Sequence, residues 1–186
     1  MKPKIIILPG NGNTDMGEIW FPWVREQLTS KGFEVIAENM PDPEMAHMNI
    51  WLPHVINKFK ADQNTIIIGH STGGVAVLRL LESHKLLGAI VIGVNHTDLG
   101  YPEEKESGYY DQPWQWGKMK ANAQWIVQFC SQDDPYIPIK EPRYIHEQID
   151  SEYHKFVDRG HFGSEHEQSK TFPELIEVID RKTNAK

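Results

Sequence analysis

The sequence predicts an α/β fold, a three-layer sandwich in which a six-stranded parallel sheet is covered by helices on both faces. Short runs of apolar and β-branched residues alternate along the chain with longer segments of helical periodicity. Glycine- and proline-rich turns separate the two kinds of segment. Several of the short runs are apolar throughout, which is typical of parallel strands covered on both sides. This alternation predicts the layered architecture.

Length and composition set the limits of this prediction. A chain of 186 residues fits one domain, 1–186, with 39% hydrophobic and 24% charged residues. A net charge of −7 argues against nucleic acid or an anionic membrane as a partner, since both favour a basic surface. Cys130 alone cannot form an internal disulfide, which fits a reducing compartment. No apolar stretch has the length of a signal peptide or membrane span, so we expect a cytoplasmic protein, and a nuclear pool is compatible.

The first third of the chain predicts two strands and two helices. Residues 4–8 form an apolar strand that ends in the loop 9–13, whose glycines can adopt unusual backbone conformations. A helix at 19–30 has its apolar residues on one face. A short strand at 33–37 leads through a proline-rich bend into a second helix at 45–59, which contains a proline.

The remaining elements alternate in the same way. A strand at 65–68 enters a glycine-rich turn and then a buried helix that continues to about residue 84. Residues 101–117 look like an irregular, aromatic-rich insertion. The other elements are predicted strands at 88–94, 124–130 and 153–157 and predicted helices at 140–149 and 172–179. Right-handed crossovers place the loops that follow the strands at one edge of the sheet.

The turn at 69–73 reads Gly-His-Ser-Thr-Gly and lies between a strand and a helix. This context is the one that a nucleophile elbow requires. Ser71 would occupy a strained backbone conformation, and Gly69 and Gly73 would let strand and helix approach closely. The pattern therefore predicts Ser71 as a catalytic nucleophile. The alternative is an ordinary glycine-rich loop with an inert serine.

A serine nucleophile needs a histidine base and a carboxylate behind it, which in elbow enzymes follow in the order serine, acid, histidine. Among nine histidines, His161 is the candidate base because it follows the last strand, next to Gly160. Asp134 is the preferred acid, and Asp133 is the alternative because a shift of one residue changes which side chain points inward. We expect no metal, since these aspartates have no third ligand at suitable spacing.

Two further groups of residues complete the predicted site. The oxyanion of the reaction intermediate needs preorganised donors. The backbone N–H of Thr72 is one candidate, and Asn11 or Gly12 in the first loop supplies the second. Aromatic residues near the first loop and in the insertion could line a small pocket or could simply fill the core. The predicted pocket residues are Trp20, Trp23, Tyr109, Trp114 and Trp116.

Acidic residues also gather in the insertion, at Glu103, Glu104, Glu106 and Asp111. One hypothesis is that they favour substrates with an ammonium group through long-range attraction. The alternative is a solvated acidic loop.

Several longer motifs carry a resemblance. They are Pro-Gly-Asn-Gly at 9–12, Asn-Met-Pro-Asp-Pro at 39–43, Ile-Trp-Leu-Pro at 50–53, Gly-His-Ser at 69–71, Ser-Gly-Tyr at 107–109, Pro-Trp-Gln-Trp at 113–116, Asp-Asp-Pro at 133–135 and Gly-His-Phe at 160–162. With them the chain resembles the retinoblastoma-binding protein 9 family, whose members are small cap-less α/β-hydrolases. The resemblance implies Ser71, Asp134 and His161 as the catalytic triad. It also implies hydrolysis of small esters and amides, including amino-acid esters.

One segment departs from that family. The human-type member has a Leu-x-Cys-x-Glu motif for pocket-protein binding before the elbow strand, whereas residues 59–63 here read Phe-Lys-Ala-Asp-Gln. Retinoblastoma binding is therefore not expected. The sequence predicts a cofactor-free serine hydrolase of an α/β-hydrolase type that acts on a small-molecule ester or amide. A catalytically weak protein that uses the same fold as an interaction module is the alternative.

Overall fold

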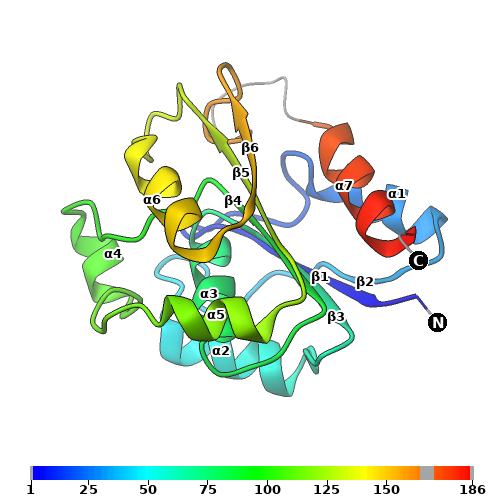
Figure 1. Cartoon of the computed structure of the whole chain (residues 1–186), viewed down its shortest axis with the longest axis horizontal. Helices are drawn as coiled ribbons and strands as arrows, with labels where there is room; N and C mark the ends of the chain where they lie inside the picture. The colour runs from blue at the N-terminus through cyan, green and yellow to red at the C-terminus, as the bar shows by residue number, and fades with distance from the viewer. Residues whose placement is uncertain (1, 164–169, 185–186) are drawn as a thin grey trace.

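The fold is described here from a computed structural model, which describes residues 2–163 and 170–184. Six parallel strands form one sheet in the order β2-β1-β3-β4-β5-β6 (Figure 1). The strands are β1 (Lys4–Leu8), β2 (Glu34–Ile36), β3 (Thr65–His70), β4 (Gly88–Ile92), β5 (Ile126–Ser131) and β6 (Glu152–Phe156). The strand order reverses direction between β1 and β3. In such sheets ligands bind outside the carboxyl ends of the strands at this switch point.

Seven helices in the described part of the chain cover the two faces of the sheet (Figure 1). One face carries α1 (Phe21–Ser30) and α7 (Pro173–Asn184). The opposite face carries α2 (Met48–Asn57), α3 (Thr72–Leu81), α5 (Trp116–Asn122) and α6 (Lys140–Ile149), while α4 (Pro102–Glu106) is a short helix near the rim. The predicted three-layer architecture is confirmed, and within the described ranges no helix has the length and apolarity needed to cross a bilayer.

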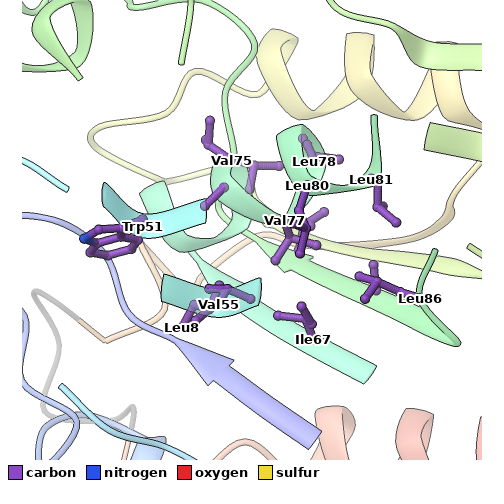
Figure 2. Packing of buried hydrophobic residues seen from close by; sticks show 14 of the residues in the cluster. Leu8, Trp51, Val55, Ile67, Val75, Val77, Leu78, Leu80, Leu81 and Leu86 are labelled. Atoms are coloured by element: carbon purple, nitrogen blue, oxygen red, sulfur yellow. The ribbon is translucent and has the colours of Figure 1, made fainter. Parts of the chain in front are cut away.

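The four central strands β1, β3, β4 and β5 are buried on both faces, which explains their largely apolar sequences, whereas the edge strands β2 and β6 are partly exposed. In β3, Ile66 and Ile68 point into the layer beneath α1 and α7, whereas Ile67 points into the layer beneath α2 and α3. Figure 2 shows the second layer, where Ile67 and Leu8 pack among helix residues that include Trp51 and Val75. Burial of apolar surface contributes about 25 cal/mol per Å² to the free energy of folding. The packing of both layers against the sheet therefore fixes the positions of the strand ends.

Several predicted boundaries differ from the structure by a few residues, and two of the differences have clear local reasons. The second helix begins at Met48, not at residue 45, because Ala46 has a positive φ of 54° and His47 is held by the carboxylate of Asp42. The insertion at 101–117 is more regular than expected. It contains α4 between Gly100 and Gly108, both at positive φ, and its end forms the first residues of α5.

Candidate active site

Ser71 lies at the sharp turn between β3 and α3. Its φ of 52° and ψ of −126° are costly for a residue with a Cβ, as the elbow prediction requires. The Ser71 N–H donates to the carbonyl of Ile92 at 2.8 Å, and its own carbonyl accepts from Gly74 and Val75 in the first turn of α3. These bonds anchor the strained residue to β4 and to the helix.

The two glycines of the elbow are required by close backbone packing. A Cβ on Gly69 would lie 2.4 Å from the carbonyl oxygen of Gly73, and a Cβ on Gly73 would lie 2.3 Å from that of Pro9. Both distances are far below a van der Waals contact, and both involve backbone atoms that cannot rotate away. The glycine spacing therefore reflects the steric requirement of the turn, and it brings the loop after β1 against the start of α3.

His161 and Asp134 form a buried pair at the same edge of the sheet. The Nδ1 atom of His161 lies 2.8 Å from Oδ2 of Asp134, and the two side chains are 6% and 2% exposed. The other carboxylate oxygen of Asp134 accepts backbone N–H bonds from Tyr136 and Ile137, each at 2.9 Å. Because Nδ1 donates to the carboxylate, Nε2 of His161 is left as the atom that can accept a proton.

Asp133, the alternative acid, has a different set of contacts. Its Oδ1 accepts from the hydroxyl of Ser131 at 2.6 Å and from the N–H of Gly160 at 2.9 Å. The Ser131 hydroxyl oxygen in turn accepts the N–H of Arg159 at 2.9 Å. Asp133 thus ties the loop after β5 to the loop after β6, whereas Asp134 contacts the imidazole of His161 directly.

His70 packs against the ring of His161 and hydrogen-bonds to its backbone. Its Nε2 lies 2.9 Å from the carbonyl oxygen of His161, so this nitrogen carries the proton and donates it, and the two rings are 4.9 Å apart. Complete burial, followed by the nearby His161, lowers the pKa of His70 to about 3, although its bond to the His161 carbonyl favours the protonated form. His70 is therefore neutral at physiological pH. The indole of Trp20 holds the next carbonyl, that of Phe162, at 2.8 Å.

Ser71 and His161 line the same cavity, which has a volume of about 390 Å³. The other residues of its wall come from the loops after β1, β3, β4 and β5 and from α4. They are Gly10, Asn11, Gly12, Thr14, His70, Asn95, Leu99, Tyr101, Glu104, Tyr136 and Ile137. The switch-point rule thus predicts the location of the cavity, but it does not predict which side chains line it.

The predicted oxyanion donors lie at this cavity or at its edge, but they are not equivalent. Asn11 and Gly12 line it, and Thr72 is the first residue of α3, directly after Ser71. The N–H of Gly12 already donates to the carbonyl of Glu44 at 3.0 Å, which removes Gly12 from the candidates. Asn11 and Thr72 are the two backbone donors that we carry forward.

The five aromatic residues predicted to form the substrate pocket do not line the cavity that contains Ser71. The described residues that line the cavity include none of Trp20, Trp23, Tyr109, Trp114 and Trp116. Trp20 and Tyr109 are buried in the two core layers, and Trp23 packs against the layer under α1. Trp114 stacks on Trp116 at 5.2 Å and lies against the guanidinium of Arg79. These aromatic residues therefore pack in or against the core, which was the alternative to a pocket in the sequence analysis.

Leu99, Tyr101, Tyr136 and Ile137 line the cavity but were not among the predicted pocket residues. Tyr101 and Tyr136 are 44% and 47% exposed. The signal that could have found them is their position in the segments that follow β4 and β5. The described residues contain no cluster of three or more His, Cys, Asp or Glu side chains arranged to hold a metal ion. His166, another of the nine histidines, lies outside the described residues.

Comparison with known proteins defines the class of the molecule. The fold is similar over its whole length to the ydeN gene product from B. subtilis, with a TM-score of 0.89, 23% identity and coverage of 100% of both chains. It is also similar to the esterase RhEst1 from Rhodococcus sp. ECU1013, with a TM-score of 0.68, 14% identity and coverage of 98% and 91% of the two chains. The architecture is therefore that of the α/β-hydrolase fold.

The family follows from the sequence comparison. Residues 5–181 match the serine hydrolase family. The chain is 44% identical over 178 residues to serine hydrolase RBBP9 from Rattus norvegicus, which covers 95% of this chain and 93% of that protein. This protein belongs to the serine hydrolase family that includes RBBP9 and YdeN, and the predicted family is confirmed.

Proposed function

We propose that this protein hydrolyses small carboxylic esters or amides through an acyl-enzyme on Ser71. One observation carries the proposal. The hydroxyl-bearing Ser71, at its strained elbow, and the imidazole of His161 line one cavity, and the carboxylate of Asp134 lies 2.8 Å behind that imidazole. Serine, imidazole and carboxylate in this order can activate a hydroxyl at neutral pH.

The chemistry follows from the protonation states. Nε2 of His161 accepts the Ser71 proton while the serine oxygen attacks the carbonyl carbon of the substrate, and Asp134 stabilises the resulting imidazolium. The imidazolium then returns the proton to the leaving alcohol or amine as the bond to the carbonyl carbon breaks. Water repeats the sequence on the acyl-enzyme and releases the acid and free Ser71. Backbone N–H groups of Asn11 and Thr72 stabilise the oxyanion in both halves.

The cavity supports small substrates. A volume of about 390 Å³ lies in the lower part of the range of small-molecule sites. Aminoacyl esters belong to the proposed class because Glu104 lines the cavity. Its negative charge attracts an ammonium group at low ionic strength. Equal specificity constants for neutral and aminoacyl esters of the same size at low salt would remove this part of the proposal.

Covalent labelling tests the proposal directly. A fluorophosphonate probe should label the native protein and fail to label Ser71→Ala, whereas Ser83→Ala, which changes an exposed serine just beyond α3, should label normally. We expect kcat/KM for p-nitrophenyl esters to fall by about 10⁴-fold or more in Ser71→Ala, because triad members act as a unit. Unchanged labelling and activity in Ser71→Ala would refute the proposal. A native protein that neither labels nor turns over esters would instead favour an interaction module.

A further inference from the structure

Glu104 is a carboxyl group in the cavity wall that the proposed chemistry does not use. It comes from α4, a helix of five residues, and is partly buried while Glu103 and Glu106 beside it are exposed. A carboxylate in such a position loses hydration, which must be replaced by hydrogen bonds. Its immediate neighbours supply them.

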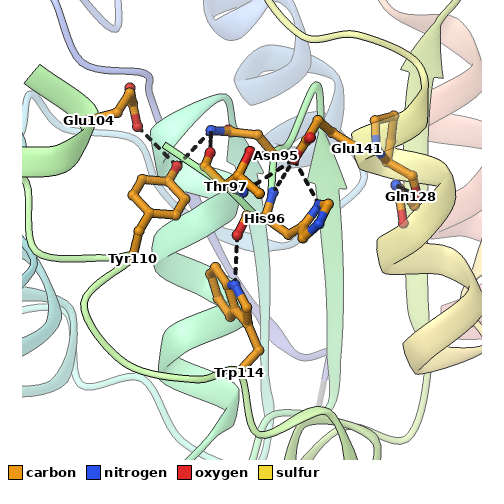
Figure 3. Close-up of polar contacts among 9 residues, drawn as sticks. Asn95, His96, Thr97, Glu104, Tyr110, Trp114, Gln128 and Glu141 are labelled. Carbon is orange, nitrogen blue, oxygen red and sulfur yellow. Dashed lines mark hydrogen bonds and ion pairs between the residues drawn. The ribbon is translucent and has the colours of Figure 1, made fainter. Parts of the chain in front are cut away.

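Two side chains donate to Glu104. Asn11 donates through Nδ2 to Oε1 at 3.1 Å, and the hydroxyl of Tyr110 donates to Oε2 at 2.9 Å. The network continues through Asn95, whose Nδ2 donates to the Tyr110 oxygen at 2.7 Å (Figure 3). We call Glu104, Asn11, Tyr110 and Asn95 the Glu104 network.

The Glu104 network connects the ends of two strands. Asn11 follows β1, and Asn95 follows β4. The loop after β4 is itself held from the other side, where Glu141 accepts N–H bonds from His96 at 3.0 Å and Thr97 at 3.2 Å (Figure 3). The loop after β4, which joins the Glu104 network through Asn95, is therefore held by hydrogen bonds on both sides.

We propose that Glu104 is a positioning residue that holds the backbone N–H group of Asn11 in place, so that it forms the oxyanion hole together with the N–H of Thr72, through its hydrogen bond to the Asn11 side chain. The inference rests on the proposed function. Asn11 and Thr72 belong to different loops that no covalent constraint keeps at a fixed separation. The Glu104 network ties the Asn11 loop to the loop after β4, and the Ser71 N–H ties the elbow to Ile92 at the end of β4. These bonds supply the constraint, and oxyanion stabilisation depends on donors that are already in position.

A carboxylate suits this role better than an amide. Each of its two oxygens accepts one of the two hydrogen bonds, whereas a glutamine has one oxygen and presents N–H donors where Asn11 or Tyr110 also donates. Glu104→Gln keeps the size of the side chain and removes at least one of the two bonds. Glu103→Gln makes the same change of charge on the adjacent, exposed residue and is the matched control.

The test separates positioning from substrate binding by using a neutral p-nitrophenyl ester. We expect Glu104→Gln to lower kcat by about 10- to 100-fold with KM changed less than about threefold, and Glu103→Gln to match the native protein. Affinity for a trifluoromethyl ketone, which forms a tetrahedral oxyanion on the serine, should fall by a factor similar to that in kcat/KM. A structural defect alone would not produce this correlation.

A double-mutant cycle identifies the contact. Asn11→Ala keeps the backbone N–H and removes the side chain that bonds to Glu104. If the two act through one contact, the combined loss in Asn11→Ala/Glu104→Gln should be close to the larger single loss and clearly below the product of the two. Multiplicative losses would show that Glu104 does not act through Asn11.

Three results would overturn the proposal. They are native kcat in Glu104→Gln, an equal loss in Glu103→Gln, and a rise in KM confined to aminoacyl esters, which would assign Glu104 to direct recognition of an ammonium group. Fluorophosphonate labelling keeps this failure distinct from failure of the proposed function. If Ser71→Ala abolishes labelling and activity while Glu104→Gln behaves as native protein, the Glu104 proposal fails alone.

Discussion

Two carboxyl groups belong to the site around Ser71: Glu104 lines the cavity, and Asp134 contacts His161 in its wall. They are held in different ways. Asp134 accepts two backbone N–H bonds on one oxygen and faces His161 with the other. Glu104 accepts its bonds from the side chains of Asn11 and Tyr110. The backbone of a single loop therefore orients Asp134, whereas side chains orient Glu104, and one of them comes from the distant loop after β1.

The difference has an electrostatic consequence. A histidine beside Asp134 can become charged during the proposed reaction, and the carboxylate stabilises that charge. Glu104 faces neutral donors. Burial raises its pKa above the ordinary value, and the hydrogen bonds from Tyr110 and Asn11 oppose that rise in part. In the proposed reaction Asp134 stabilises a transient charge, whereas Glu104 holds a backbone group in place.

The largest effect should come from the Asp134 side. Asp134→Asn leaves the loop geometry close to native but replaces the acceptor facing Nδ1 of His161, so we expect kcat to fall by about 10³- to 10⁴-fold. Ester hydrolysis at saturating substrate measures it. Asp133→Asn is the control, because an asparagine oxygen can still accept from Ser131 and Gly160, and we expect less than about a tenfold loss. Comparable losses in the two variants would show that Asp133 shares the role assigned to Asp134.

The next effect concerns His70, which lies under the His161 loop. Its pKa is lowered to about 3 from an ordinary 6.5, mainly by burial, so the unfolded chain binds a proton that the folded protein does not bind between these values. Its contribution to stability is present above pH 6.5 and is lost as pH falls. The free energy of unfolding should drop by about 1.4 kcal/mol per pH unit below 6.5 relative to His70→Gln.

Chemical denaturation of both proteins between pH 7 and pH 4 checks this prediction. Taking the difference between them cancels the titration of groups they share. Parallel curves would mean that His70 is protonated without cost in the folded state, and the burial argument would be wrong.

The smallest effect has the opposite sign and belongs to Glu104. Because its folded pKa is raised above 4.5, the folded protein retains a proton that the unfolded chain loses first. Stability relative to Glu104→Gln should therefore fall as pH rises from about 4.5 through the raised pKa. The same denaturation series, extended to pH 8, measures it. A relative stability that rises over this range would show that the hydrogen bonds outweigh burial.

Local signals in the sequence were enough for the fold and for the serine. Continuous apolar runs such as 4–8 and 65–68 predicted buried parallel strands, and the strand–turn–helix context predicted the conformation of Ser71. The order of serine, aspartate and histidine along the chain then indicated Asp134 and His161, which the structure brings together at 2.8 Å. The catalytic roles of these residues stay predictions until they are tested.

Other features could not be read from the chain. The sequence around Trp20 and Trp114 would look the same whether these residues lined a pocket or packed in the core. Tertiary packing placed both side chains away from the cavity. Glu104 looked like its neighbours Glu103 and Glu106, because nothing local distinguishes a carboxylate that meets Asn11 across 93 positions of sequence from one that meets water.

By itself, then, the sequence determined which segments are strands, where the chain must turn sharply and which residues follow the carboxyl ends of the strands. These features depend on steric and hydrophobic properties of consecutive residues. Tertiary structure alone decided which aromatic rings are buried, which N–H groups are already occupied, as in Gly12, and which of several acidic side chains enters the cavity. Those outcomes depend on contacts between distant segments, and such contacts exist only once the sheet and its two helical layers have formed.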